Sequence, residues 1–201
     1  MSAYYPVYLN LARRRCLVVG GGAVAERKVQ GLVEADADVV VVSPSLTETL
    51  HRWASDGTVR HVPRSFHDED VEDCALVIGA TDRTEVNARV AIAARRRGIW
   101  VNIVDTPAAC DFIAPAVVRR GELQIAITTG GKSPTLAKRL REGLEELIGP
   151  EYGEVAEILG ALRSAIHRHE KLPEVRKAMF ERLVEAAGLP LTMGPIAAEP
   201  W

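Results

Sequence analysis

Three consecutive glycines follow a short apolar run in the segment CLVVGGGAVAERKV, residues 16–29. Gly20, Gly22 and Ala25 match the pattern G-x-G-x-x-[GA], which binds the pyrophosphate of a dinucleotide when it joins a strand to a helix. The first glycine permits the tight turn, the second lets the backbone approach the pyrophosphate, and the helix N-terminus supplies amide donors. An ordinary glycine-rich turn has the same letters, so the surrounding elements decide between the two.

The end of the apolar run VVVVSPS bears on which dinucleotide would bind. An acidic residue about twenty positions after the glycines usually binds the ribose hydroxyls. Ser43 stands near that position, and neither an acidic residue nor an arginine follows immediately. Because a serine can bond a hydroxyl or a 2′-phosphate, the local residues leave NAD and NADP open.

A second glycine pair occurs in TTGGKSPTLAKRL. A triphosphate-binding loop would need its first glycine at Ala126, inside a predicted strand, so that pattern fails. A helix N-terminus that offers its amides and Lys132 to an anionic group is the better interpretation. A simple capped helix start is the alternative.

Asp105 follows a predicted buried strand in VNIVDTPAACDFIAP. Ligands of open α/β sheets bind at the carboxyl ends of the strands, where a carboxylate can act as a base. Its alternative is a turn-forming role before Thr106 and Pro107.

Four β-branched runs are predicted strands, and the segments between them have apolar residues at helical spacing. The strands are CLVVG, DVVVVS, CALVIGA and IWVNIV, and the helices are AVAERKVQGLVEA, LTETLHRWASD and TEVNARVAIAARRR. Residues 1–105 therefore predict a doubly wound α/β domain with a Rossmann-like parallel sheet.

A different pattern follows Asp105. Two strand-like runs in DFIAPAVVRRGELQIAIT predict a hairpin joined by residues 119–122. Ser133 is a predicted N-cap and Pro134 the first residue of a helix that ends at Gly149 and Pro150. A second helical block is predicted over residues 151–187. Its apolar stripe must bury against the sheet or a partner chain. The tail 188–201 is predicted to be irregular. The predicted domains are 1–112, 113–148 and 149–201.

The composition excludes several functional classes. The 201 residues are 47% hydrophobic and 26% charged, with a net charge of -2, which fits a globular protein and disfavours a general nucleic-acid binder. The sequence has no run of eighteen apolar residues and no signal-peptide pattern, so we expect a cytoplasmic protein. Cys16, Cys74 and Cys110 are scattered, which predicts reduced thiols and no structural zinc site.

The ordered series VVGGGAVAERKV, GATD and VNIVDTPAACDFIAPAVVRRGELQIAITTGGKSPTLAKRLRE resembles the precorrin-2 dehydrogenase family of siroheme synthesis. The similarity covers residues 5–148 closely, and YGEVAEILGALRSAI resembles the family's dimerisation region more loosely. The family includes stand-alone dehydrogenases, proteins that also insert iron, and a module fused to a methyltransferase. The resemblance implies that NAD⁺ takes a hydride from precorrin-2 to give sirohydrochlorin, with Asp105 as the general base.

The resemblance also implies binding residues. Those for the cofactor are Gly20, Gly22, Ala23, Val24, Ser43, Pro44, Ser45, Thr81, Asp82, Asn102 and Val104. Asn102 has the alternative of bonding only backbone. The carboxylates of a tetrapyrrole need cationic and amide donors. The residues expected to supply them are Arg119, Arg120, Thr129, Gly130, Gly131, Lys132, Ser133 and Lys138. For the charged residues the alternative is a solvated charged face. The family's helical region implies a homodimer.

Two alternatives remain beside the dehydrogenase. A non-catalytic NAD(H)-sensing module would use the same glycine turn but would not need Asp105 or the cationic residues expected to bind the tetrapyrrole. For iron insertion the histidines form no convincing site, since His167 and His169 point to different helix faces. We expect no metal ligands, and iron insertion that is absent or weak.

Overall fold

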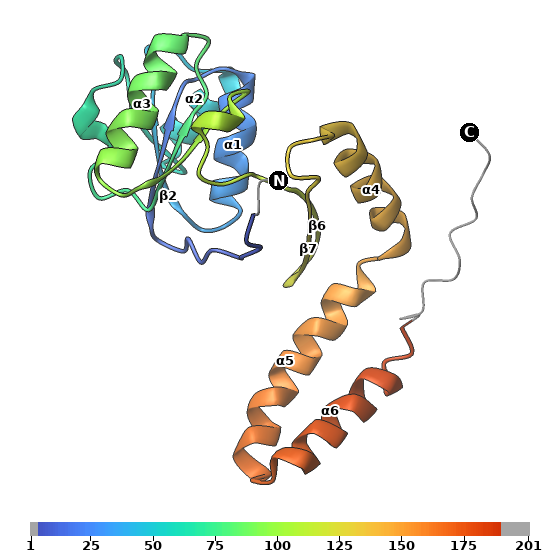
Figure 1. Ribbon diagram of the computed structural model, residues 1–201. Helices are drawn as coiled ribbons and strands as arrows, with labels where there is room; N and C mark the ends of the chain where they lie inside the picture. The colour runs from blue at the N-terminus through green and yellow to red at the C-terminus, as the bar shows by residue number, and fades with distance from the viewer. Residues whose placement is uncertain (1–3, 190–201) are drawn as a thin grey trace, which may run out of the picture. The chain divides into compact units, whose positions relative to one another are not determined.

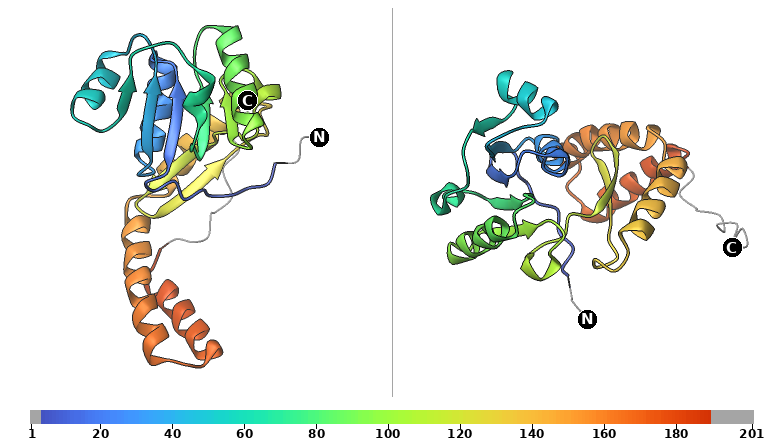
Figure 2. Two further views of the ribbon diagram at one scale, coloured as in Figure 1. Left: turned by 90° about the vertical axis from the view of Figure 1, so that its left-hand side faces the viewer. Right: turned by 90° about the horizontal axis from the view of Figure 1, so that it is seen from above.

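The computed structural model describes residues 4–189, which fall into two compact units with a boundary after Ala114. The first unit holds a five-stranded parallel sheet of order β3-β2-β1-β4-β5 (Figure 1, Figure 2). Its strands are β1 (Arg15–Val19), β2 (Asp38–Val42), β3 (Arg60–Val62), β4 (Leu76–Gly79) and β5 (Trp100–Ile103). Its helices are α1 (Ala23–Val33), α2 (Glu48–Ser55) and α3 (Thr84–Arg96). The predicted Rossmann-like fold is confirmed.

Helices cover both faces of this sheet. Cys16 and Val18 of β1 pack with α1 and α2 on one face, and Leu17 and Val19 pack with α3 on the other. Successive side chains of a strand point to opposite faces, so a strand covered on both sides reads as a continuous apolar run. This burial is the reason why the central strands were visible in the sequence.

The edge strand β3 was not predicted. It has only three residues, Arg60, His61 and Val62, and none of them is fully buried. An edge strand contacts a neighbour on one side only, so its side chains need not be apolar. The sequence therefore lacks the pattern that identifies the central strands.

The second unit begins with the predicted hairpin, formed by β6 (Ala116–Arg120) and β7 (Leu123–Ile127). The prediction of its turn was too long. Arg119 and Arg120 are strand residues paired with Gln124 and Leu123, so only Gly121 and Glu122 connect the strands. Gly121 has a φ of 57°, a left-handed conformation that favours glycine.

Three helices complete the second unit: α4 (Pro134–Leu147), α5 (Glu151–His169) and α6 (Pro173–Ala186). Ser133 caps α4 as predicted, because its hydroxyl accepts a hydrogen bond from the Leu136 amide at 3.2 Å. The predicted helical block over 151–187 is helical, but it is divided into two helices, and Pro173 begins the second. A separate domain from residue 149 stays a prediction, and the predicted irregular tail lies outside the described residues from residue 190 on.

Cys16 of β1 has no exposed surface, and burial raises the pKa of its thiol from 9.0 to about 11. Between these values the unfolded chain releases a proton that the native chain keeps. We therefore expect the free energy of unfolding to fall as the pH rises through this window, by up to about 3 kcal/mol for this group.

Urea unfolding between about pH 8 and pH 11 measures this dependence. Cys16→Ala should lower stability near pH 8 through the lost packing but should show a shallower pH slope, so the difference between the two proteins should shrink as the pH rises. Equal slopes for the two proteins would contradict the assignment to Cys16.

Candidate functional site

The carboxyl ends of four parallel strands lie level in the sheet. Val19 of β1 is in register with Val42 of β2 and with Gly79 of β4, and Gly79 is in register with Ile103 of β5. The loops that follow these strands therefore begin at one edge of the sheet, where open α/β sheets bind their ligands. These loops hold the predicted cofactor residues and Asp105.

The three glycines after β1 have different surroundings. Gly20 has a φ of 127°, and a Cβ there would overlap the carbonyl oxygen of Ala80. A Cβ on Gly21 would overlap the carbonyl oxygen of Ser45. A Cβ on Gly22 would have no atom within 4 Å. Gly20 and Gly21 are therefore required by the fold, whereas Gly22 leaves open space in front of the helix.

That open space lies at the N-terminus of α1. Gly22 is the N-cap and supplies no side-chain hydrogen bond to the helix. The first amide groups of a helix have no partner within the helix, and together with the helix dipole they favour an anion. Gly22 and Ala23 are exposed, and Val24 is half-buried. The residues present thus fit the pyrophosphate of a dinucleotide.

The predicted ribose loop after β2 is held by its own polar groups. Ser43 is 6% exposed, and its hydroxyl donates to the Ser45 carbonyl at 2.7 Å. The ring Nε2 of His61 bonds the Ser43 carbonyl at 2.9 Å and must be the donor, because its partner is a carbonyl oxygen. Pro44 and Ser45 are exposed. The Ser43 proton is therefore committed to the loop, and its role toward a ribose stays a prediction.

Thr47 ties this loop to α1. Its hydroxyl donates to the Glu26 carboxylate and also accepts from the Leu50 amide at 3.3 Å, so it caps α2. The Thr47 amide donates to the Gly21 carbonyl at 2.9 Å. The sequence analysis missed Glu26 and Thr47, whose contacts join residues far apart in the chain.

Asn87 of α3 fixes the loop after β4. Its side-chain oxygen accepts from the Thr81 hydroxyl at 2.8 Å, and its side-chain nitrogen donates to the Thr81 carbonyl at 2.9 Å. Asp82 is exposed beside Thr81. Asn87 was not predicted, since an asparagine in the second turn of a helix gives no signal of its own.

Asp105 lies at a tight turn directly after β5. The Thr106 amide donates to the Ile103 carbonyl at 3.2 Å, and Asp105 is the third residue of this turn. Its φ is 57°, a left-handed conformation that few residues other than glycine, asparagine and aspartate adopt. Its side chain is exposed. Strained residues of this kind gather at functional sites.

The chain then returns along the outer edge of β5. After the 3-10 turn η2 (Pro107–Ala109), the Asp111 amide donates to the Val101 carbonyl at 2.8 Å. The Asn102 side-chain nitrogen donates to the Phe112 carbonyl at 2.9 Å. The Asn102 side-chain nitrogen thus bonds backbone, and its predicted cofactor role stays a prediction. Val104 is half-buried and packs against the core under α1.

Lys28 of α1 adds a cation that the sequence analysis missed. Burial lowers the pKa of its ammonium group from the ordinary value, and neighbouring Arg27 lowers it further. The Asp105 carboxylate and the Cys110 thiol act in the opposite direction. The half-buried Lys28 therefore lies within electrostatic range of the predicted base.

The predicted substrate residues belong to the second unit. Gly130 and Gly131 both have left-handed conformations, with φ of 63° and 81°. The Thr129 hydroxyl accepts from the Ser133 amide at 2.9 Å, which closes the loop before α4, and Lys132 in this loop is exposed. Lys138, on α4, is also exposed and lies 3.6 Å from the Glu142 carboxylate.

Arg120 has a structural task in the same unit. Its Nε donates to the Ile148 carbonyl at 2.6 Å, and Nη2 donates to the Glu145 carbonyl at 2.7 Å. These are the last carbonyls of α4, which a cation stabilises. Binding a substrate through this guanidinium would compete with the cap. Arg119 lies beside it in β6.

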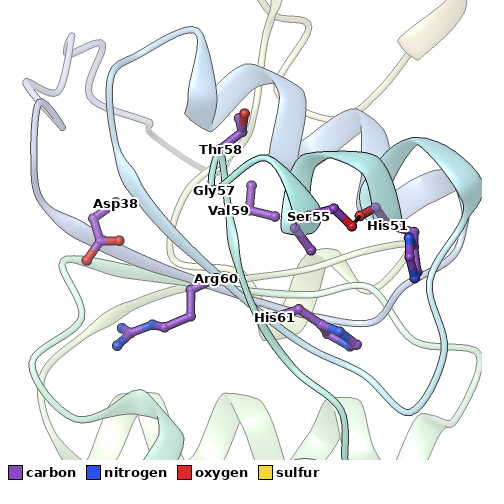
Figure 3. Close-up of a pocket in the computed structure, with 9 residues that line it drawn as sticks. Asp38, His51, Ser55, Gly57, Thr58, Val59, Arg60 and His61 are labelled. Atoms are coloured by element: carbon purple, nitrogen blue, oxygen red, sulfur yellow. Dashed lines mark hydrogen bonds between the residues drawn. The ribbon is translucent and has the colours of Figure 1, made fainter.

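An open groove of about 690 Å³ lies along α2 and β3 (Figure 3). Its lining includes His51, His61, Asp38 and Arg60, and none of the predicted site residues. Within residues 4–189, no group of three or more His, Cys, Asp or Glu side chains is placed to hold a metal ion. No helix in this range is long and apolar enough to cross a membrane.

Comparisons with known proteins give a consistent result. Residues 7–116 match a family described as putative NAD(P)-binding, and residues 120–147 match the central part of a sirohaem biosynthesis protein. Siroheme synthases of Nitrosococcus oceani and Thioalkalivibrio sulfidiphilus are 39% and 42% identical over 92% and 90% of this chain. The chain spans only 39% and 37% of their lengths.

A solved structure described as SirC, precorrin-2 dehydrogenase, is 29% identical and has a TM-score of 0.77. The match covers 90% of this chain and 89% of that protein. It therefore extends over both units of the fold.

The three glycines allow the folding and binding roles of the turn to be separated. We expect Gly20→Ala or Gly21→Ala to lower the free energy of unfolding by about 2 kcal/mol or more, because each added methyl group overlaps a carbonyl oxygen. Gly22→Ala should cost about 1 kcal/mol or less as a poorer N-cap. Its methyl group should nevertheless weaken NAD⁺ binding by about tenfold or more, since it fills the space before the amides.

Urea unfolding and calorimetric titration with NAD⁺ measure the two effects. Unchanged NAD⁺ affinity in Gly22→Ala would mean that the pyrophosphate does not lie at this turn.

Proposed function

Because the chain belongs to the putative NAD(P)-binding family and is similar to siroheme synthases and to SirC, precorrin-2 dehydrogenase, we propose that it oxidises precorrin-2 to sirohydrochlorin. The observation that carries the proposal is the position of Asp105. Its carboxylate follows β5 at the sheet edge where the glycine turn follows β1. A cofactor site and a base thus occur at one edge of one rigid sheet.

The cofactor NAD⁺ supplies the hydride acceptor in this reaction. The amides of the α1 N-terminus, at Gly22, Ala23 and Val24, would hold its pyrophosphate, and a Cβ on Gly22 would have no atom within 4 Å. The loops at Pro44 and Ser45 and at Thr81 and Asp82 are fixed by internal hydrogen bonds, so they form preorganised walls for the adenosine half.

Asp105 removes the proton in the proposed step. With bound NAD⁺ as hydride acceptor, Asp105 would take the proton that a neighbouring position of precorrin-2 loses, so that one new double bond would form and the products would be sirohydrochlorin, NADH and a proton. The carboxylate holds this proton and passes it to solvent, which its exposure allows. The left-handed turn fixes the backbone of Asp105, which favours a defined position of the base.

The loop before α4 is the proposed site for the substrate's carboxylates. Lys132 is exposed there, and the left-handed Gly130 and Gly131 shape the backbone around it. Thr129 and Ser133 keep the loop closed, and Lys138 follows one turn later on α4. We assign Arg120 to capping α4 rather than to binding the substrate. Arg119 of β6 is kept as a further cation of the proposed substrate site.

Asp105→Asn tests the proposed base. The substitution keeps a side chain that tolerates the left-handed turn but cannot accept the proton. We expect NAD⁺ affinity and stability close to those of the unmodified protein, and NADH formation from precorrin-2 reduced by about a hundredfold or more.

Asp36→Asn is a matched control, since Asp36 is also an exposed aspartate with a left-handed φ, of 55°, but precedes β2 at the other edge of the sheet. The Asp36→Asn variant should form NADH from precorrin-2 at the rate of the unmodified protein. An unmodified protein that binds NAD⁺ but never reduces it would favour an NAD(H)-sensing module instead. Robust siroheme formation from sirohydrochlorin and Fe²⁺ would add the iron insertion that we do not expect.

We further propose that the chain acts as a homodimer through its second unit. Leu136, Leu140 and Leu147 of α4 are 50%, 46% and 55% exposed, and Ile158 of α5 is 58% exposed. Contiguous exposed apolar side chains on helices are typical of interfaces between subunits.

Leu136→Glu with Leu140→Glu should give a monomer in light scattering after size-exclusion chromatography, because two charges would be buried without partners. Arg139→Glu changes the charge of the same helix without removing apolar surface and should remain dimeric. A monomeric unmodified protein would refute the proposal.

A further inference from the structure

The turn that carries Asp105 follows β5, which is an edge strand of the sheet. β5 is the last strand of the order β3-β2-β1-β4-β5, so Ile103 has a strand neighbour only on the side of β4. Its carbonyl already accepts the Thr106 amide, but its amide on the outer side would be unpaired without a substitute. The left-handed conformation of Asp105 needs support from its surroundings, since it costs free energy in a residue other than glycine.

The thiol of Cys110 provides this support. Its Sγ accepts a hydrogen bond from the Ile103 amide at 3.2 Å and lies 3.1 Å from the Ile103 carbonyl oxygen. It also lies 3.3 Å from the Thr106 carbonyl oxygen. One thiol proton can be donated to either carbonyl, while a sulfur lone pair receives the amide. Cys110 thus contacts the first and last residues of the turn that contains Asp105.

The rest of the returning segment is held independently of the thiol. Asp111 bonds the Val101 amide at 3.1 Å and pairs with Arg95 of α3 at 3.0 Å, and Asn102 bonds the Phe112 carbonyl. Loss of the Cys110 thiol would therefore leave residues 111 and 112 in place and release only the turn. This separation makes the function of the thiol testable.

We infer that Cys110 is a positioning residue, whose thiol holds the turn at residues 103–106 so that the Asp105 carboxylate stays in place. This inference rests on the proposed function only where turnover is concerned. Its structural part, a thiol that clamps the turn, stands whether or not the protein oxidises precorrin-2.

Cys110→Ala and Cys110→Ser form the test pair. Alanine removes all three contacts at little loss of volume, whereas the serine hydroxyl keeps one donor and the acceptor. In Cys110→Ala we expect hydrogen exchange of the Ile103 and Thr106 amides to become at least about tenfold faster, and kcat for precorrin-2 to fall by about ten- to a hundredfold. The KM for NAD⁺ should change by less than about twofold, since the glycine turn is untouched. Cys110→Ser should recover most of both effects.

Cys74→Ala is the matched control, because Cys74 is a buried thiol whose sulfur lies 3.7 Å from the carbonyl oxygens of Asp70 and Glu72, away from this turn. It should leave exchange at Ile103 and Thr106 unchanged. Unchanged exchange in Cys110→Ala, or a serine variant no better than alanine in both measurements, would overturn the inference. If the unmodified protein shows no turnover of precorrin-2, only the proposed function is refuted. The hydrogen-exchange data would still test whether the Cys110 thiol holds the turn.

Discussion

Backbone hydrogen bonds continue one residue beyond the strands of the sheet. The amides of Gly20, Ala80 and Val104 donate to the carbonyls of Val42, Val19 and Gly79, each the last residue of the neighbouring strand. The first residue of each loop is thus still part of the ladder, and all the loops leave the sheet at one level. The glycine turn, the ribose loop and the turn at Asp105 owe their common edge to this ladder, because parallel strands cannot shift register without losing it.

Most polar side chains near this edge hold the loops rather than face an open site. Each of four such side chains donates a hydrogen bond to backbone or to another side chain: Ser43, Thr47, Thr81 and Asn102. Groups that can still meet a ligand include the amides at the start of α1, the Asp105 carboxylate and the half-buried Lys28. Rigid walls with few reactive groups fit a site that orients a cofactor against a substrate and leaves the redox chemistry to the cofactor.

The parts visible in the sequence are those with a local pattern. The central strands could be predicted because both faces of the sheet are covered, and the glycine turn because its spacing depends on adjacent residues. Gly21, Asn87 and Cys110 could not be predicted, since each acts through a contact with a residue brought near only by the fold. Arg120 shows the converse: its charge suggested a ligand, and its guanidinium donates to carbonyls at the end of α4, 25 and 28 positions away in the chain, so its role toward a substrate stays a prediction.

The segment from Cys110 to Phe112 lies where a sixth strand would otherwise add to the sheet. An uncovered strand edge is a template for pairing with another chain. The segment after Asp105 thus also covers backbone groups of β5 that would otherwise be open to pairing with another chain.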